Sequence, residues 1–136
     1  MNAAVLDASV VIKWFRSTGE AHVEAARSYR SELRAGNLRV YVPPLLFLEI
    51  VNIAGRRWQW QRLELVELAY TLADLGFEVR EPPLAGIAEW TARGLTAYDA
   101  SYAALAEAES AKLVTADERL LAIAKDVALP LSAAGA

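Results

Sequence analysis

Residues 3–15 read AAVLDASVVIKWF, and this stretch indicates the fold of the whole chain. The apolar run from Ala3 to Leu6 predicts a strand, and VVIKWF predicts a helix that begins near Asp7 or Ser9. A buried strand that passes directly into a helix is the opening unit of an alternating α/β chain. Asp7 is therefore expected at the carboxyl end of the first strand.

The rest of the chain repeats this alternation. Further strands are predicted at residues 39–42, 77–79, 112–115 and 128–131, and helices at 20–35, 45–54, 61–75, 84–93, 97–108 and 118–126. Such alternation predicts an α/β fold with a parallel sheet and right-handed crossovers. No internal repeat, linker or low-complexity segment interrupts it, so one domain spanning residues 1–136 is expected.

Composition narrows the class of protein and of chemistry. Hydrophobic residues make up 55% of the chain, which suits a sheet buried on both faces. No apolar run reaches the ~18 residues of a membrane span, and the N-terminus lacks the basic region and cleavage site of a signal peptide, so a cytoplasmic protein without membrane contact is expected. The net charge of −3 does not show the basic excess of a typical nucleic-acid binder.

Few residue types remain for catalysis. The absence of cysteine excludes thiolate catalysis and cysteine-ligated zinc. The single histidine, His22, lies among polar helix residues and is expected at the surface. A Ser-His-Asp triad or a histidine-rich metal site is therefore not expected, and any chemistry depends on carboxylates, hydroxyls, lysine and arginine.

Four acids fall where such a sheet would present a ligand site. Asp7 and Asp117 each end a predicted strand, Asp99 lies in the first turn of the nearly apolar helix 97–108, and Glu49 interrupts the apolar run LLFLEIVNI. In parallel α/β sheets the ligand site lies beyond the carboxyl ends of the strands. We therefore expect all four carboxylates to project toward one edge of the sheet.

Each acid alone also has a structural explanation. Asp7 suits a helix N-cap, and Thr96 with Asp99 forms a capping-box pattern in which the acid also complements the helix dipole. These alternatives stay open for each residue taken separately.

The same holds for the other two acids. Asp117 suits an N-cap, and Thr115 with Glu118 forms a second capping-box pattern. Glu49 and Asn52 are three residues apart on a helix, which also fits a narrow solvent-facing stripe.

The conjunction of the four acids favours a metal site over four unrelated caps. Carboxylates brought close together repel one another, and a cation relieves that repulsion. Oxygen-only ligands favour Mg²⁺ or Mn²⁺. In a small protein without other catalytic groups, such a site is suited to hydrolysis of a nucleic-acid phosphodiester.

Four segments also carry a family resemblance. VLDASVVIKWF, PLLFLEIVN, LTAYDASYAALAE and LVTADERLL together resemble the PIN domain, and specifically the single-domain VapC-type toxin ribonucleases. The segments run from Val5 to Leu121, in the order and at the spacing of the family. Each is weak alone, and the four together are specific.

The resemblance implies a three-layer fold with a central parallel sheet of four to five short strands in the order 3-2-1-4-5. It implies an endoribonuclease that depends on Mg²⁺ or Mn²⁺, forms homodimers and is blocked by a VapB-type antitoxin. The family's acidic quartet maps onto Asp7, Glu49, Asp99 and Asp117, with Asp7 and Asp99 holding the metal and the other two acting on a second ion or through water. Ser9, Asn52 and Thr115 match positions that support the metal or its waters.

Several basic and aromatic residues are candidates for holding RNA. The run Arg56-Arg57-Trp58-Gln59-Trp60 interleaves charge with aromatic rings, which suits phosphate contact with base stacking. It equally suits a helix C-terminus whose tryptophans fill a core or a dimer interface. The further candidates near the acids are Lys13, Arg16 and Arg119, each of which also reads as an ordinary solvated charge.

Two other functions fit parts of the sequence. A receiver-like signalling domain also binds Mg²⁺ in an acidic pocket, but it normally has paired acids near the first strand and a lysine after the last. A catalytically silent PIN-like module that binds only protein is the second alternative. Four mutually repelling acids have no evident use in such a scaffold, which favours the nuclease.

Overall fold

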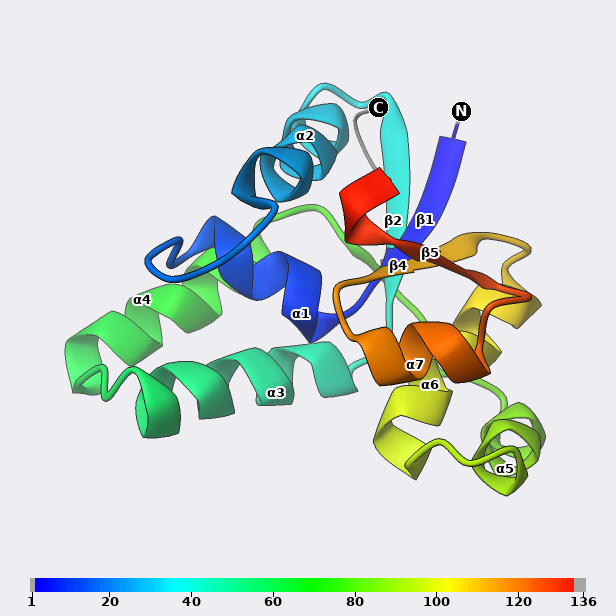
Figure 1. Ribbon diagram of the computed structural model, residues 1–136. Coiled ribbons are helices and arrows are strands. Elements are labelled where there is room, and N and C mark those ends of the chain that lie inside the picture. Colours follow the sequence, from blue (N-terminus) through cyan, green and yellow to red (C-terminus); the bar gives the residue numbers. More distant parts are fainter. Residues whose placement is uncertain (1, 134–136) are drawn as a thin grey trace.

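The computed structural model describes residues 2–133, and its centre is a parallel β-sheet (Figure 1). Within these residues the sheet has five strands in the order β3-β2-β1-β4-β5, all pairs parallel. The strands are β1 (Asn2–Leu6), β2 (Leu38–Val42), β3 (Glu78–Val79), β4 (Lys112–Thr115) and β5 (Ala128–Pro130). The expected α/β class and strand order are confirmed. The expected single domain also covers residues 1 and 134–136, which lie outside the described residues.

The three central strands are buried toward their carboxyl ends. Val5 of β1 pairs with Tyr41 of β2 and Leu113 of β4, and all three are at most 8% exposed. Strands covered on both faces read as continuous apolar runs, as in residues 4–6 of β1, whereas β2 also carries the exposed Arg39 near its start. Each run ends where the chain turns toward the helices, so polar side chains that follow a strand gather at one edge.

Helices cover both faces of the sheet. They are α1 (Ala8–Val11), α2 (Val23–Arg34), α3 (Leu45–Asn52), α4 (Arg62–Ala73), α5 (Leu84–Ala92), α6 (Ala97–Ala108) and α7 (Glu118–Ile123), with 3₁₀ turns at Ile12–Trp14 and Leu131–Ala133 and a π-helical turn at Ile53–Arg57. None of the helices within residues 2–133 has both the length and the apolar character that a membrane crossing requires.

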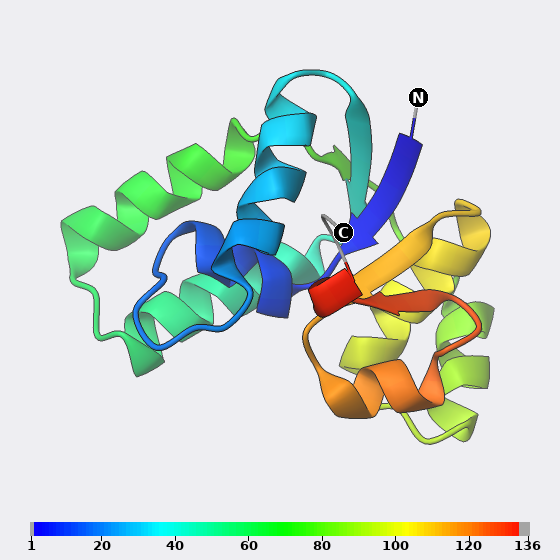
Figure 2. The same ribbon diagram turned by 45° about the horizontal axis from the view of Figure 1, so that its top comes forward.

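Crossover handedness explains which helices share a face. The connections from β1 to β2 and from β2 to β3 run toward one edge of the sheet, whereas those from β3 to β4 and from β4 to β5 run toward the other. Right-handed crossovers place helices of these two sets on opposite faces. Figures 1 and 2 show this grouping, with α2, α3 and α4 apart from α5, α6 and α7, and with α3 and α4 reaching away from the sheet.

The helices differ from the sequence prediction mainly at their ends. The predicted helix 20–35 begins only at Val23, because Gly19 and His22 adopt positive φ of 76° and 57° and Glu20 instead pairs with Lys13. The predicted helix 45–54 is α-helical only to Asn52 and continues as a π-helical turn. The predicted helix 118–126 ends at Ile123, where the Val127 N–H bonds back to the Ala124 carbonyl and closes a turn.

Candidate active site

The chain reverses its direction of winding between β1 and β4, which are neighbours in the sheet. A crevice forms beyond the carboxyl ends of the strands at such a switch point. Asp7 directly follows β1, and Asp117 lies two residues beyond the end of β4. Both strand-end acids therefore lie at the position where this fold class binds ligands.

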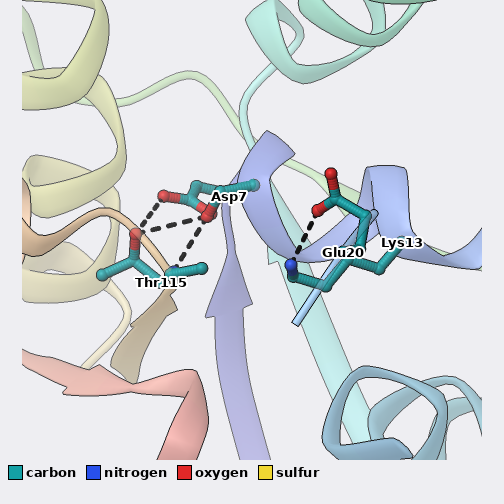
Figure 3. Close-up of polar contacts among 6 residues, drawn as sticks. Asp7, Lys13, Glu20 and Thr115 are labelled. Atoms are coloured by element: carbon teal, nitrogen blue, oxygen red, sulfur yellow. Dashed lines mark hydrogen bonds and ion pairs between the residues drawn. The ribbon is translucent and has the colours of Figure 1, made fainter. Parts of the chain in front are cut away.

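Asp7 is the most buried of the four acids, with 6% of its surface exposed. It occupies the N-cap position of α1 but makes no side-chain cap hydrogen bond. Its carboxylate accepts instead from the hydroxyls of Ser9 and Thr115, each at 2.5 Å and each on a different oxygen. Figure 3 shows Thr115 beside the Asp7 carboxylate. Two side chains that are 106 residues apart in the chain thus fix one carboxylate.

Thr115 and Asp117 form the next part of the network. The Thr115 hydroxyl accepts from the Asp117 N–H at 3.0 Å, and Asp117 Oδ1 accepts from the N–H groups of Arg119 and Leu120. Asp117 therefore is an N-cap, as its alternative explanation proposed. The predicted capping box of Thr115 with Glu118 is wrong, because Thr115 lies within β4 and the helix begins after Asp117.

Asp99 also lies at a helix start. Thr96 is the N-cap of α6, and its hydroxyl accepts from the Asp99 N–H at 3.1 Å. This is one half of the expected capping box, and it uses the backbone of Asp99 rather than its carboxylate. Capping therefore leaves the Asp99 side chain available for another role.

Glu49 reaches the same region from α3. Its carboxylate accepts a hydrogen bond from the Tyr102 hydroxyl of α6. Its other neighbours form an open groove of about 530 Å³ lined by Leu45, Leu48, Val51, Asn52 and Tyr98. The expected solvent stripe is only partly correct, because Asn52 is exposed whereas Glu49 is half-buried.

Mutual repulsion links the four carboxylates. The charge of Asp117 raises the pKa values of both Asp7 and Asp99, and the charge of Asp99 raises that of Glu49. Each acid thus lies within electrostatic reach of at least one other, which agrees with the expected gathering at one edge of the sheet. The Arg119 guanidinium opposes this effect at Asp99 by lowering its pKa.

Burial is the largest influence on three of the acids. It raises the pKa values of Glu49 and Asp99, and it raises that of Asp7 from 3.8 to about 6 although Ser9 and Thr115 favour the charged form. A buried carboxylate with few neutralising partners gains from a bound cation. The site therefore favours positively charged ligands.

The side-chain oxygens of the site suit a hard divalent ion that is held by only a few direct protein ligands. All donors are oxygens, and each Asp7 oxygen accepts one hydroxyl and keeps a second lone pair. Within residues 2–133 no three acidic or histidine side chains approach closely enough to hold one ion together. Any ion held here would therefore take one or two of these carboxylates directly and keep waters in its remaining positions.

The residues predicted to hold RNA fall into different environments. Lys13 is 5% exposed, and its ammonium lies 2.8 Å from Glu20 Oε1 (Figure 3). The prediction that Lys13 is available to an RNA phosphate is therefore wrong. The 3₁₀ turn that carries Lys13 is buried, so the alternative prediction of an ordinary solvent-exposed charge is also wrong. Arg119 is exposed at the rim of the acids, where its guanidinium donates to the Gly94 carbonyl.

The tryptophan run is divided between packing and exposure. The Trp58 ring lies 5.2 Å from that of Trp60, and the Arg16 guanidinium lies 5.6 Å from the Trp58 centroid. Arg56 and Arg57 are exposed in the π-helical turn. The geometry favours packing for the rings and leaves the two arginines accessible.

His22 and Tyr102 complete the surroundings. His22 is exposed, as expected, and lines a small cavity of about 150 Å³ together with Thr115 and Asp117. Tyr102 was not predicted as a site residue, although it lies one helical turn after Asp99 on the same face. That spacing was the available signal, but it does not reveal a contact with Glu49, 53 residues earlier.

Comparisons with known proteins agree with this fold. Residues 4–126 match the model of the PIN domain. The chain is 36% identical over 120 residues to Ribonuclease VapC9 of Mycobacterium tuberculosis, covering 85% of this chain and 87% of the relative.

Solved structures share the architecture. PAE2754 from Pyrobaculum aerophilum is 27% identical and aligns with a TM-score of 0.68 over 97% of this chain and 91% of its own. VapC20 of Mycobacterium tuberculosis, described as a toxin that cleaves the sarcin-ricin loop, is 17% identical and shares the fold with a TM-score of 0.64, over 88% of this chain and 93% of its own. The matches to the PIN domain and to VapC9 each cover most of the chain, and the chain therefore belongs to the PIN-domain family, in its VapC-type branch.

Proposed function

We propose that this protein is an endoribonuclease that depends on Mg²⁺ or Mn²⁺ and acts in the cytoplasm as the toxin of a toxin–antitoxin pair. One observation carries the proposal: four separate chain segments bring Asp7, Glu49, Asp99 and Asp117 to the switch point of the sheet, each within electrostatic reach of at least one other. Membership in the VapC-type branch supports the choice of RNA as the substrate.

Asp7 and Asp99 would hold the metal directly, and Glu49 and Asp117 would act on a second ion or through water. When bound, the ion polarises the phosphodiester and lowers the pKa of a water. Ser9 and Thr115 keep the Asp7 carboxylate in one orientation by donating to both of its oxygens. This preorganisation avoids rearrangement of the carboxylate when the substrate arrives.

Basic residues at the rim would contact the RNA backbone. Arg119 lies beside the acids, and Arg56 and Arg57 present two further exposed charges on the π-helical turn. Phosphate contacts of this kind provide affinity that does not depend on sequence. Asn52, exposed in the groove next to Glu49, would contact a metal-bound water or the substrate.

The proposal includes two protein partners. A VapB-type antitoxin would cover the acidic site, for which cationic side chains are the complementary chemistry. A second copy of this chain would form a homodimer. Leu63 and Tyr70 of α4 are each 72% exposed, and apolar residues of this size at a surface support a protein contact.

The experiment measures cleavage of a mixed RNA substrate by the purified protein with Mg²⁺ or Mn²⁺ and with excess EDTA. We expect cleavage only with metal, none by Asp99→Asn, and wild-type rates for Asp74→Asn, which removes an exposed carboxylate at the end of α4. Cleavage in EDTA would disprove the metal mechanism, and cleavage by Asp99→Asn would disprove the site.

A second readout is thermal stability. An ion that binds only the native state stabilises it by about 2.7 kcal/mol at 100 times its Kd, so Mn²⁺ should raise the melting temperature of the wild type and raise that of Asp99→Asn much less. A folded protein that binds metal but cleaves no RNA would favour the silent module. The sheet topology argues against a receiver-like signalling domain. The strands of a receiver domain have the order 2-1-3-4-5, whereas the strands of this protein have the order 3-2-1-4-5.

A further inference from the structure

Tyr102 lies between the helices that carry two of the acids. It is on α6, one turn after Asp99, and only 1% of its surface is exposed. Its ring is part of the core, and its hydroxyl donates across to the Glu49 carboxylate of α3. A buried tyrosine hydroxyl needs a hydrogen-bond partner, and here that partner is a carboxylate of the site.

Glu49 needs such a partner to stay at the site. Its side chain has several rotamers, and the groove beside it opens past Leu48, which is 71% exposed. The Glu49 carboxylate is half-buried, and the like charge of Asp99 acts on it. A glutamate without a donor would gain solvation and lose repulsion by turning toward the groove.

The Tyr102 hydroxyl is suited to this task because it remains protonated. Burial raises the pKa of Tyr102, and the charges of Glu49, Asp7 and Asp99 raise it further. These effects also show that the hydroxyl lies within reach of acids from three separate segments. A tyrosine hydroxyl with its ordinary pKa of about 10 is already a neutral donor at neutral pH, and its hydrogen bond to Glu49 places it among the carboxylates.

We propose that Tyr102 is a positioning residue that holds the Glu49 carboxylate in the acidic site by a hydrogen bond between α6 and α3. The inference rests on the proposed function, since it assigns Tyr102 a role in the same reaction. Tyr102 is too buried to touch RNA and acts only through Glu49.

Tyr102→Phe tests this role because it keeps the ring and removes only the donor. Loss of a side chain that orients a metal ligand typically lowers affinity or activity about 10- to 100-fold. We expect a fall of that size in kcat with the KM for RNA unchanged. We also expect a weaker Kd for Mn²⁺, measured by calorimetry without RNA. Tyr41→Phe is the matched control, because Tyr41 is also buried and its hydroxyl is hydrogen-bonded to Arg39.

A double-mutant cycle separates positioning from a general structural role. If Tyr102 acts through Glu49, adding Tyr102→Phe to Glu49→Ala should change neither kcat nor the Kd for Mn²⁺ any further. Wild-type kcat and Mn²⁺ affinity in Tyr102→Phe would overturn the inference, and so would effects of the two substitutions that multiply.

Failure of the proposed function would look different. A wild type that binds Mn²⁺ but cleaves no RNA would contradict the ribonuclease, while the Mn²⁺ titrations of the single and double variants would still decide the role of Tyr102. A wild type that neither binds Mn²⁺ nor cleaves RNA would overturn both.

Discussion

Replacing Asp7 with asparagine should make the metal-free protein more stable at neutral pH. Asp7 is 6% exposed, and burial raises its pKa from 3.8 to about 6. The native state therefore holds the Asp7 proton more strongly than the unfolded chain does. The stability that Asp7 contributes is fully present below pH 3.8 and is lost as the pH rises through about 6.

The magnitude follows from the two pKa values. One pKa unit corresponds to about 1.4 kcal/mol, so the separation between 3.8 and about 6 corresponds to about 3 kcal/mol. Asparagine has nearly the same shape and no charge; one of the two hydroxyls of Ser9 and Thr115 can still donate to its amide oxygen, and the other can rotate to accept from its NH2 group. The free energy of unfolding of Asp7→Asn minus that of the wild type should therefore rise by up to about 3 kcal/mol between pH 4 and pH 7.

Urea denaturation in EDTA at intervals from pH 4 to pH 8 measures this difference. The other acids are present in both proteins, so their titration largely cancels in the comparison. Asp74→Asn is the control, because its carboxylate is exposed and its removal should give a nearly flat difference. A flat difference for Asp7→Asn, or one that falls as the pH rises, would refute the assignment of Asp7 as a buried, destabilising carboxylate.

Two further predictions concern the support of Asp7 and the binding of RNA. Thr115→Val should lower the free energy of unfolding at pH 7 by about 1.5–3 kcal/mol, because it removes a buried hydrogen-bond donor to the Asp7 carboxylate. Thr91→Val, at an exposed position, is the control and should have little effect. Urea denaturation measures both changes, and equal losses of stability would contradict the reasoning. Arg56→Ala combined with Arg57→Ala should weaken RNA binding and flatten its salt dependence by up to ~2 phosphate contacts. Dissociation of a dimer with unchanged RNA affinity would instead assign these arginines to an interface.

Local sequence patterns were sufficient for the elements and for the identity of the acids. Strand 112–115 was predicted at the bounds the structure has, because a short apolar run between polar residues is a local signal. The strand order 3-2-1-4-5 followed from the family resemblance, since periodicity does not encode which strands are neighbours. Helix ends were less accurate, as at Glu20, because a contact with Lys13 competed with helix formation.

The sequence by itself determined that Asp7 and Asp117 follow strands, that Asp99 lies at a helix start and that Glu49 interrupts an apolar helix, because those positions depend on neighbours along the chain. Only the tertiary structure decided what each acid meets. Ser9 and Thr115 meet on one carboxylate, and Tyr102 reaches Glu49 across 53 residues, because sheet register and crossover handedness bring these segments together. Sheet register and crossover handedness both depend on segments far apart in the chain, so no short stretch of sequence determines them.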